Sequence, residues 1–317
     1  MANLNNSVFT LNKYTEYVLD EAIAIFEPRY GWWAGGQPSN TTLIDRVSFR
    51  NDTVTASSRG TLRSGASGGS YCAGVTGHLD AWFHVGGGPA SPAGAGKTSI
   101  DRLIFASDVG GTAVRSPISA GRFYNTGFQN ADTDGYYAAG YSSGGGRSLV
   151  DRIIFASDST TGVAKGNLDR TTYYVAGAES PSSGYVGGGG PIDAPLSSVS
   201  KIIFASDTAT AVAKGPLADA KAFPGAESNT TDAWFGGGHS KTSVSRIIFA
   251  SDTATAVAKG PLTGNSYGGN GSGNTTDAWI NRGTGNTGVS RIIFATDTAA
   301  ATARGNLNVT HGFGGSN

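Results

Sequence analysis

Cysteine is nearly absent from this sequence, whose 317 residues contain one. That residue, Cys72, excludes an internal disulfide framework and a zinc site built from several cysteines. No segment approaches the roughly 20 continuous apolar residues that a membrane-spanning helix requires, so no membrane span is expected. The first residues lack a basic start followed by an apolar run, so we expect synthesis in the cytoplasm without a cleaved secretion signal.

Net charge is also missing. Lysine plus arginine number 23, and aspartate plus glutamate number 23. A balanced chain has no general attraction for phosphate backbones or anionic lipid surfaces. We therefore expect no nucleic-acid partner.

Glycine, in contrast, is abundant: 49 of 317 residues, against a usual share of about 7 %. Its context is a repeat, seen most clearly as VSRIIFASDTATAVAKGPL at 244–262. Nearly the same string occupies 199–217 and 289–307, and looser copies begin at Leu43, Ile100 and Val150. The six copies align on Asp52, Asp108, Asp158, Asp207, Asp252 and Asp297.

A repeat of roughly 40 to 50 residues is typical of propellers and arrays. In the fifth copy we expect a strand at 232–235 closed by three glycines, and a strand at 245–251 with apolar groups on both faces. A tight turn at Asp252 and a fourth strand at 256–259 follow. The next segment, around 265–271, is rich in small residues, which suits an innermost strand where backbones crowd near an axis.

The two ends of the repeat region predict how it closes. Residues 30–36 resemble a second strand without a first, and residues 308–315 resemble a first strand without a second. Joined, they complete one four-stranded sheet. The sequence therefore predicts an all-β fold at 30–317, a six-bladed β-propeller with velcro closure, which removes exposed sheet edges.

Residues 1–29 lie outside the repeat, and we expect them to form a separate helical arm. Tyr14, Val18, Ala22 and Phe26 recur every four residues, which places them on one helical face, and Pro28 ends the run. An isolated short helix is marginal in water, so this apolar face needs a surface to cover. The helix packs on its own domain as a lid or docks a partner subunit as an assembly arm.

The repeat region resembles the kelch β-propeller family. The matching features are glycine runs after the second strand, such as 86–88 and 236–238, the aspartate turn, and an aromatic residue in each third strand. These aromatics are Phe49, Phe105, Phe155, Phe204, Phe249 and Phe294. The tryptophan that kelch repeats usually carry in the fourth strand is replaced by small or aliphatic residues.

The string SRIIFASDTATAVAKGPL, repeated with little variation, is similar to propeller repeats in virion and tail-fibre-type proteins of tailed phages, especially those of cyanobacteria. This resemblance implies a non-enzymatic structural protein of the virion, in the tail, a fibre or a capsid-associated position. It implies other virion proteins as partners, in a symmetric multi-copy assembly. The alternative is an attachment module that binds a host receptor or surface glycan.

The most conspicuous polar residues recur six times: a basic residue in each third strand, a basic residue at the end of each fourth strand, and the turn aspartate. A ring of like groups on the axis would bind an anion or a metal. Third and fourth strands, however, lie away from the axis, and a catalytic site needs unlike groups that converge. We therefore expect turn capping and short ion pairs that fix each hairpin.

No catalytic, metal or cofactor site is expected. The four histidines form no pair at helical spacing, and Cys72 is a poor basis for copper chemistry of the galactose-oxidase type. Loops after the second strands vary between copies and share one face with the fourth-to-first connections. Candidate binding residues on that variable face are Trp82, Tyr185, Trp234 and Trp279, which stack on sugars or a partner protein unless they pack between blades.

Overall fold

A computed structural model describes residues 30–38, 40–63, 71–87, 96–109, 111–115 and 117–316. Within these residues the chain forms six four-stranded sheets and one short two-stranded hairpin. The helical arm expected at 1–29, with Tyr14, Val18, Ala22 and Phe26, lies outside the described residues.

Each sheet is one blade. From the innermost strand to the outermost, blade 1 is β26 (Gly315–Ser316), β1 (Tyr30–Ala34), β2 (Leu43–Ser48) and β3 (Ser57–Thr61). In the same order, blade 2 is β4 (Cys72–Thr76), β5 (Asp80–Val85), β6 (Ile100–Ile104) and β7 (Ala113–Arg115). Blade 3 is β8 (Thr126–Asn130), β9 (Asp134–Ala138), β12 (Val150–Ile154) and β13 (Val163–Ala164), with the hairpin β10 (Tyr141–Ser142) and β11 (Gly145–Gly146) beside it.

The last three blades come from the closest copies of the repeat. Blade 4 is β14 (Val175–Ser180), β15 (Ser183–Gly188), β16 (Val199–Ile203) and β17 (Val212–Lys214). Blade 5 is β18 (Gly225–Ser228), β19 (Asp232–Gly236), β20 (Val244–Ile248) and β21 (Val257–Lys259). Blade 6 is β22 (Gly271–Gly273), β23 (Asp277–Asn281), β24 (Val289–Ile293) and β25 (Thr302–Arg304).

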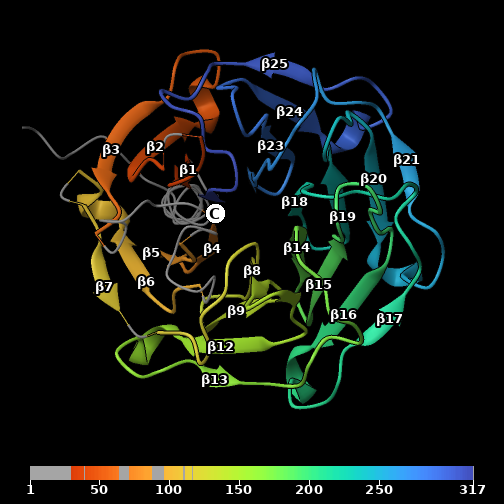
Figure 1. The fold of residues 1–317 in the computed structure, drawn as a ribbon. Helices are drawn as coiled ribbons and strands as arrows, with labels where there is room; N and C mark the ends of the chain where they lie inside the picture. The colour runs from red at the N-terminus through yellow and green to blue at the C-terminus, as the bar shows by residue number, and fades with distance from the viewer. Residues whose placement is uncertain are drawn as a thin grey trace, which may run out of the picture.

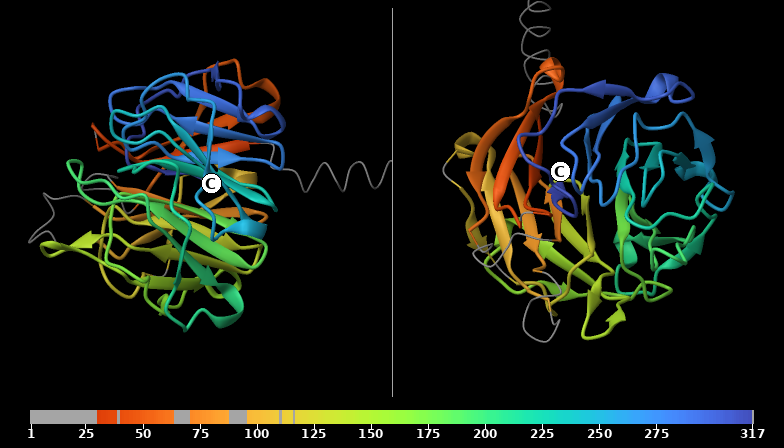
Figure 2. Two further views of the ribbon diagram at one scale, coloured as in Figure 1. Left: turned by 90° about the vertical axis from the view of Figure 1, so that its right-hand side faces the viewer. Right: turned by 45° about the horizontal axis from the view of Figure 1, so that its top comes forward.

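The blades close into a ring, so the predicted six-bladed propeller is confirmed. The first strands β4, β8, β14 and β18 lie near the axis, and the fourth strands lie at the rim (Figure 1). Two further views show the ring from other sides (Figure 2). Blade 1 combines both ends of the repeat region: Trp33 pairs with Ser316, and Ala34 pairs with Gly315. The velcro closure is thus present, but the predicted bounds of the closing strand, 308–315, are wrong, because β26 pairs with β1 only at Gly315 and Ser316.

His311 and Asp45 strengthen this closure. His311 is fully buried, with Nδ1 2.6 Å from the Gly35 carbonyl oxygen and Nε2 3.1 Å from the carboxylate of Asp45. Asn308 donates to the same carboxylate from its backbone and its side chain. Burial alone would raise the pKa of Asp45, but these hydrogen bonds and the charge of His311 lower it overall. The C-terminal segment is therefore held by side chains as well as by β26.

Each third strand ends earlier than expected. In blade 5 the strand stops at Ile248, and a 3-10 helix, η6 (Phe249–Ser251), follows with Asp252 as its C-cap. The other blades have the same turn of helix: η1 (Phe49–Asn51), η3 (Phe105–Ser107), η4 (Phe155–Ser157), η5 (Phe204–Ser206) and η7 (Phe294–Thr296). The prediction of a strand through residue 251 is therefore wrong, because the chain coils there to return as the short outer strand.

The inner strands crowd one another, as their small residues predict. A Cβ atom on Gly127 would lie 2.1 Å from the carbonyl oxygen of Gly74 in the neighbouring blade, and one on Gly74 would lie 2.1 Å from that of Ser316. Any side chain there would push two backbones apart. In blade 6 the inner strand is β22, slightly later than the expected 265–271.

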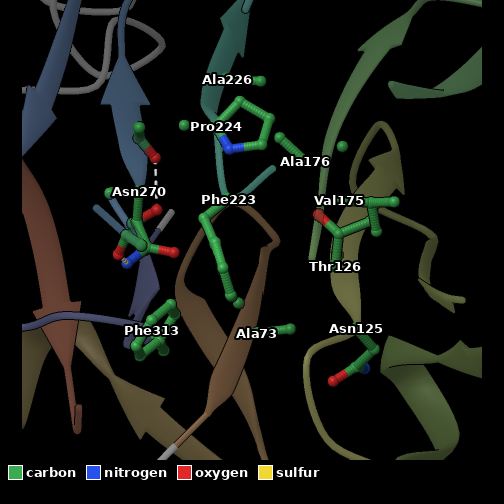
Figure 3. Close-up of a pocket in the computed structure, with 18 of the residues that line it drawn as sticks. Ala73, Asn125, Thr126, Val175, Ala176, Phe223, Pro224, Ala226, Asn270 and Phe313 are labelled. Carbon is green, nitrogen blue, oxygen red and sulfur yellow. Dashed lines mark hydrogen bonds between the residues drawn. The ribbon is translucent and has the colours of Figure 1, made fainter. Parts of the chain in front are cut away.

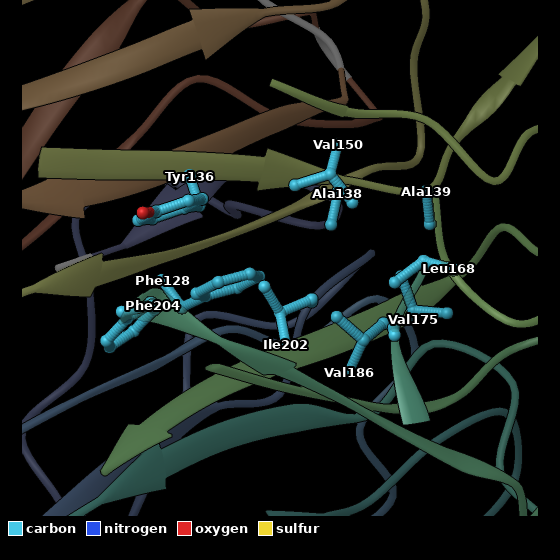
Figure 4. Close-up of a cluster of buried hydrophobic side chains, with 11 residues drawn as sticks. Phe128, Tyr136, Ala138, Ala139, Val150, Leu168, Val175, Val186, Ile202 and Phe204 are labelled. Atoms are coloured by element: carbon cyan, nitrogen blue, oxygen red, sulfur yellow. The ribbon is translucent and has the colours of Figure 1, made fainter. Parts of the chain in front are cut away.

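The hydrophobic core lies between blades and is divided into six clusters. In the cluster between blades 3 and 4, Tyr136 stacks on Phe204 with ring centroids 5.1 Å apart, and Val150, Val186 and Ile202 fill the rest (Figure 4). Each sheet is covered on both faces by its neighbours. In blade 5, for example, Ile247 of the third strand belongs to the cluster shared with blade 4, and Val244 belongs to the cluster shared with blade 6.

Candidate functional site

The charged residues that recur in all six repeats join neighbouring blades. Asp252 of blade 5 accepts hydrogen bonds from Tyr185 Oη at 2.9 Å and Lys201 Nζ at 2.8 Å, and Lys214 Nζ lies 3.0 Å away. All three side chains belong to blade 4. We call such a set an inter-blade latch: one aspartate, an aromatic and a basic side chain of the preceding blade that donate hydrogen bonds to it, and a second basic side chain within ion-pair distance.

All six joints have this latch. The aspartates with their latch partners are Asp108 with Trp32, Arg46 and Arg59; Asp158 with Trp82, Arg102 and Arg115; Asp207 with Tyr136, Arg152 and Lys165; Asp252 with Tyr185, Lys201 and Lys214; Asp297 with Trp234, Arg246 and Lys259; and Asp52 with Trp279, Arg291 and Arg304.

The turn aspartates do not pair with the basic residues of their own hairpin, so that part of the prediction is wrong. The basic side chains reach the turn aspartate of the next blade, but in four blades the third-strand arginine also pairs with a second-strand aspartate of its own blade, as Arg102 does with Asp80 at 2.8 Å. Each latch aspartate is at least about nine-tenths buried, so its bonds are shielded from water. At Asp252, burial opposes ionisation, but hydrogen bonds from Lys201 and Lys214 lower the pKa overall. The latches hold the ring together and leave their charged groups occupied.

The aromatic residues predicted for the binding face are buried inside the joints. Trp82, Tyr185, Trp234 and Trp279 are at most 2 % exposed. Each stacks on the phenylalanine that begins the 3-10 helix of the next blade, as Trp82 does on Phe155 with centroids 4.1 Å apart. Their prediction as binding residues is wrong, because the second strand directs them between sheets and away from solvent. Packing between blades, the alternative, is confirmed for all four.

The histidines and Cys72 form no metal centre in the described part of the chain. No group of three His, Cys, Asp or Glu side chains there is placed to hold a metal ion. His84 is fully buried, and burial together with the nearby Arg122 lowers its pKa to about 4. Burial also raises the pKa of the Cys72 thiol, which makes it unreactive as a nucleophile at neutral pH. Within the described residues, no helix is long and apolar enough to cross a membrane.

A cavity of about 100 Å³, which we call the axial well, lies between the inner strands (Figure 3). Its walls are glycine and alanine backbone from β4, β8, β14, β18 and β22. Because small residues line it, its chemistry is decided by the few larger side chains at its two ends.

Aromatic side chains form the floor of the axial well. They are Tyr71, Tyr124, Tyr174, Phe223 and Phe313, one from each of five blades, and each has a left-handed backbone with φ between 57° and 62°. Rings from alternate blades touch across the axis: Tyr124 lies 6.0 Å from Phe223, and Phe223 lies 4.7 Å from Phe313. Tyr267 of blade 6 completes the contacts.

The left-handed backbone of these bulky residues costs about 1 to 3 kcal/mol each. Because the same strain recurs at five equivalent places, the closed floor is built by the ring as a whole. That backbone directs the aromatic side chains toward the axis, where their contacts close this end of the propeller.

A belt of polar side chains surrounds the mouth of the axial well at the opposite ends of the inner strands. Gln129 donates to Glu179 Oε1 at 2.6 Å, and Ser228 donates from its backbone nitrogen to Glu227 Oε1 at 2.9 Å. Burial raises the pKa of Glu179 to about 8, with repulsion from Glu227 as the second cause. Burial likewise raises the pKa of Glu227 to about 7. Both carboxyl groups border the well.

No protein-family model matches this sequence, and no curated protein matches it significantly. The kelch and phage resemblances therefore rest on the repeat motifs of the chain itself.

The axial well is not predicted from the sequence, although one signal for it is present. An aromatic residue stands directly before the small-residue strand in five copies: Tyr71, Tyr124, Tyr174, Phe223 and Phe313. Glu179 and Glu227 are likewise visible only as departures from the repeat. Nothing in the sequence places any of these residues on the axis, because each is separated from the next by a whole blade.

Proposed function

We propose that this protein is a non-enzymatic structural component of a phage virion, in the tail, a fibre or a capsid-associated position, that presents a rigid propeller for assembly contacts. The supporting observation is the latch. The repeated charged residues, which in an enzyme would supply a reacting centre, here join one blade to the next at all six joints. A stiff ring holds its surface loops in fixed positions.

The loops themselves differ from blade to blade, as contact surfaces do. Isolated bridges tie loops after second strands to fourth-to-first connections, such as Gln37 to Gly312 and Gly238 to Ser266. Both kinds of loop thus lie on the same face. This variable face is the proposed assembly surface.

Purified particles of the phage that encodes this sequence test the proposal. Quantitative mass spectrometry and immunogold labelling with antibodies against the propeller should find the protein in fixed copy number at one position. Its absence from intact particles would rule the proposal out. Deletion of residues 1–29 separately tests the assembly arm: unchanged incorporation would show that docking does not depend on it.

Attachment to a host receptor or glycan is the second candidate function. Half-buried aromatics on the variable face favour it, among them Tyr141 and Tyr173, whose rings lie 5.1 Å apart beside the hairpin of β10 and β11. Aromatic rings of this kind stack on sugars. A glycan array probed with the full chain distinguishes the candidates, because the purely structural function predicts no specific binder.

A further inference from the structure

The mouth of the axial well carries two carboxyl groups without a basic partner. A latch aspartate such as Asp252 has two lysine or arginine side chains within ion-pair distance. Glu179 and Glu227 form no ion pair within the described residues, and they accept hydrogen bonds from the Gln129 amide and the Ser228 backbone nitrogen. In a neutral chain whose other charges are paired so regularly, these two carboxyls are a local excess of negative charge.

The lower part of the well adds an independent observation at Asn125, which is 7 % exposed and borders the well. One terminal atom of its amide lies 3.1 Å from Nδ1 of His84, and Nε2 of that ring lies 2.9 Å from the carbonyl oxygen of Lys97. A carbonyl only accepts, so Nε2 carries the proton, and Nδ1 of the neutral ring must accept. The amide atom that faces His84 is therefore nitrogen.

It follows that the other terminal atom of Asn125 is the amide oxygen. This position is buried and has no hydrogen-bond partner among the described residues. Buried polar atoms are nearly always satisfied, so an unsatisfied acceptor calls for a donor from outside the chain. The well thus offers acceptors to a ligand at both levels: two carboxyls at the mouth and one amide oxygen near the floor.

The aromatic floor and the volume of the well restrict which ligand can supply the hydrogen-bond donor. Tyr124, Tyr174 and Phe223 line the well, and aromatic rings attract cations through their ring electrons. An engineered cavity of about 150 Å³ holds benzene. A well of about 100 Å³ is smaller than that cavity and therefore favours a slender chain over a ring. The hydrogen-bond acceptors, the aromatic rings and the small volume of the well together match an ammonium group on an alkyl chain.

We propose that the axial well binds a linear alkylammonium ion, either a free polyamine or the lysine side chain of a partner protein, with its charge held between Glu179 and Glu227. The chain passes along the glycine and alanine walls. A second ammonium group, where the ligand has one, meets the oxygen of Asn125 above the aromatic rings. This binding site goes beyond the proposed structural function and does not depend on it.

The pKa values of the two carboxyls agree with a site built for a cation. They are raised to about 8 and about 7 because each carboxyl is buried, and Glu179 is also repelled by Glu227. The strands that flank the two glutamates place no titratable side chain beside them. Glu179 lies opposite Gly184 of β15 and beside Gln129 of β8. Glu227 lies opposite Trp234 of β19 and beside Gly273 of β22. An ammonium ion favours the ionised carboxyls, so its binding releases protons and tightens from pH 6 to pH 8.

A divalent metal is a poorer match. Ca²⁺ takes six to eight oxygen ligands, and no three metal-ligating side chains gather within the described residues. Calcium is therefore the control for simple charge neutralisation.

Isothermal titration calorimetry on the full chain tests the proposal at pH 8 and pH 6. The probes are spermidine, putrescine, butylammonium, Nα-acetyl-lysine amide and CaCl₂. We expect saturable one-to-one binding of at least one alkylammonium ion, tighter at pH 8. Glu179→Gln and Glu227→Gln should each weaken it about tenfold or more, because each removes a charged hydrogen-bond acceptor. Both variants keep the shape of the side chain and remove a buried charge, so they should fold.

Asp193→Asn is the matched control, because it removes the same charge from an exposed position and should leave affinity unchanged. Spermidine binding at least tenfold tighter than butylammonium supports the free polyamine, and equal affinity of butylammonium and acetyl-lysine amide supports a partner's lysine. The proposal is overturned by three results: no saturable heat with any alkylammonium ion, equal weakening in Asp193→Asn, or CaCl₂ binding more tightly at the same carboxyls.

Discussion

Trp279 donates a hydrogen bond of 2.7 Å from Nε1 to the carboxylate of Asp52, although 227 positions of sequence separate the two residues. This bond belongs to the latch between the last blade and the first. The joint that closes the ring therefore has the same chemistry as the five joints between consecutive blades. The latches differ in detail, because the aromatic partner is Trp in four joints and Tyr in two, but each joint keeps a buried aspartate bound by the preceding blade.

Removal of a latch carboxylate should destabilise the protein measurably. Asp252→Asn leaves Lys201 and Lys214 part-buried without their counter-ion. We expect a loss of about 1.5 to 3 kcal/mol in the free energy of unfolding, the usual worth of hydrogen bonds to charged groups. Urea denaturation at pH 7 measures it. Asp193→Asn should stay within about 0.5 kcal/mol of wild type, and an equal loss there would contradict a specific role for the latch.

Two substitutions at Trp234 separate its hydrogen bond from its packing. Trp234→Phe keeps a ring on Phe294 but loses the 2.8 Å bond to Asp297, and should cost about 1 kcal/mol or somewhat more. Trp234→Ala also empties the space between blades and should cost about 3 to 5 kcal/mol. Thermal unfolding followed by circular dichroism ranks them. Equal losses would mean that stacking contributes nothing to the joint.

Because the inner strands are crowded, we expect the same glycine-to-alanine substitution to differ greatly in its stability cost between two positions. Gly127→Ala places a methyl group 2.1 Å from a backbone oxygen, whereas Gly145→Ala places one where nothing lies within 4 Å. The first should cost about 1 to 3 kcal/mol or more, as overpacking does, and the second should stay within about 0.5 kcal/mol of wild type. Matched denaturation curves decide this, and tolerance at position 127 would show that the inner strands can move apart.

The two glutamates of the axial well predict an unusual dependence of stability on pH. Their pKa values in the folded protein, about 8 and about 7, lie above the ordinary value of 4.5. Between pH 4.5 and pH 8 the folded state therefore holds more protons at these groups than the unfolded state does. Their contribution to stability is fully present below pH 4.5 and is lost as pH rises to 8.

Chemical denaturation of wild type and Glu179→Gln at several pH values isolates this effect, because other groups cancel in the difference. His84, whose pKa of about 4 lies below its ordinary value, contributes the opposite slope between pH 4 and pH 6.5 to both proteins. We expect the variant to gain stability over wild type steadily from pH 5 to pH 8. A constant difference across that range would show that Glu179 ionises normally.

The sequence by itself determined the number of blades, the strand order within each and the closure by both ends, because these follow from the repeat period and from alternation along strands. The tertiary structure alone decided which residues each ion pair joins. In near-identical repeats, a lysine such as Lys201 has the same local sequence whether it pairs with Asp207 of its own blade or with Asp252 of the next.

Only the direction of the side chain, fixed by the packing of sheet on sheet, settles that choice. The axial well could not be predicted from the sequence for a related reason. Its floor and mouth come from several blades, and residues about 50 positions apart meet only because the ring brings each inner strand to the same axis.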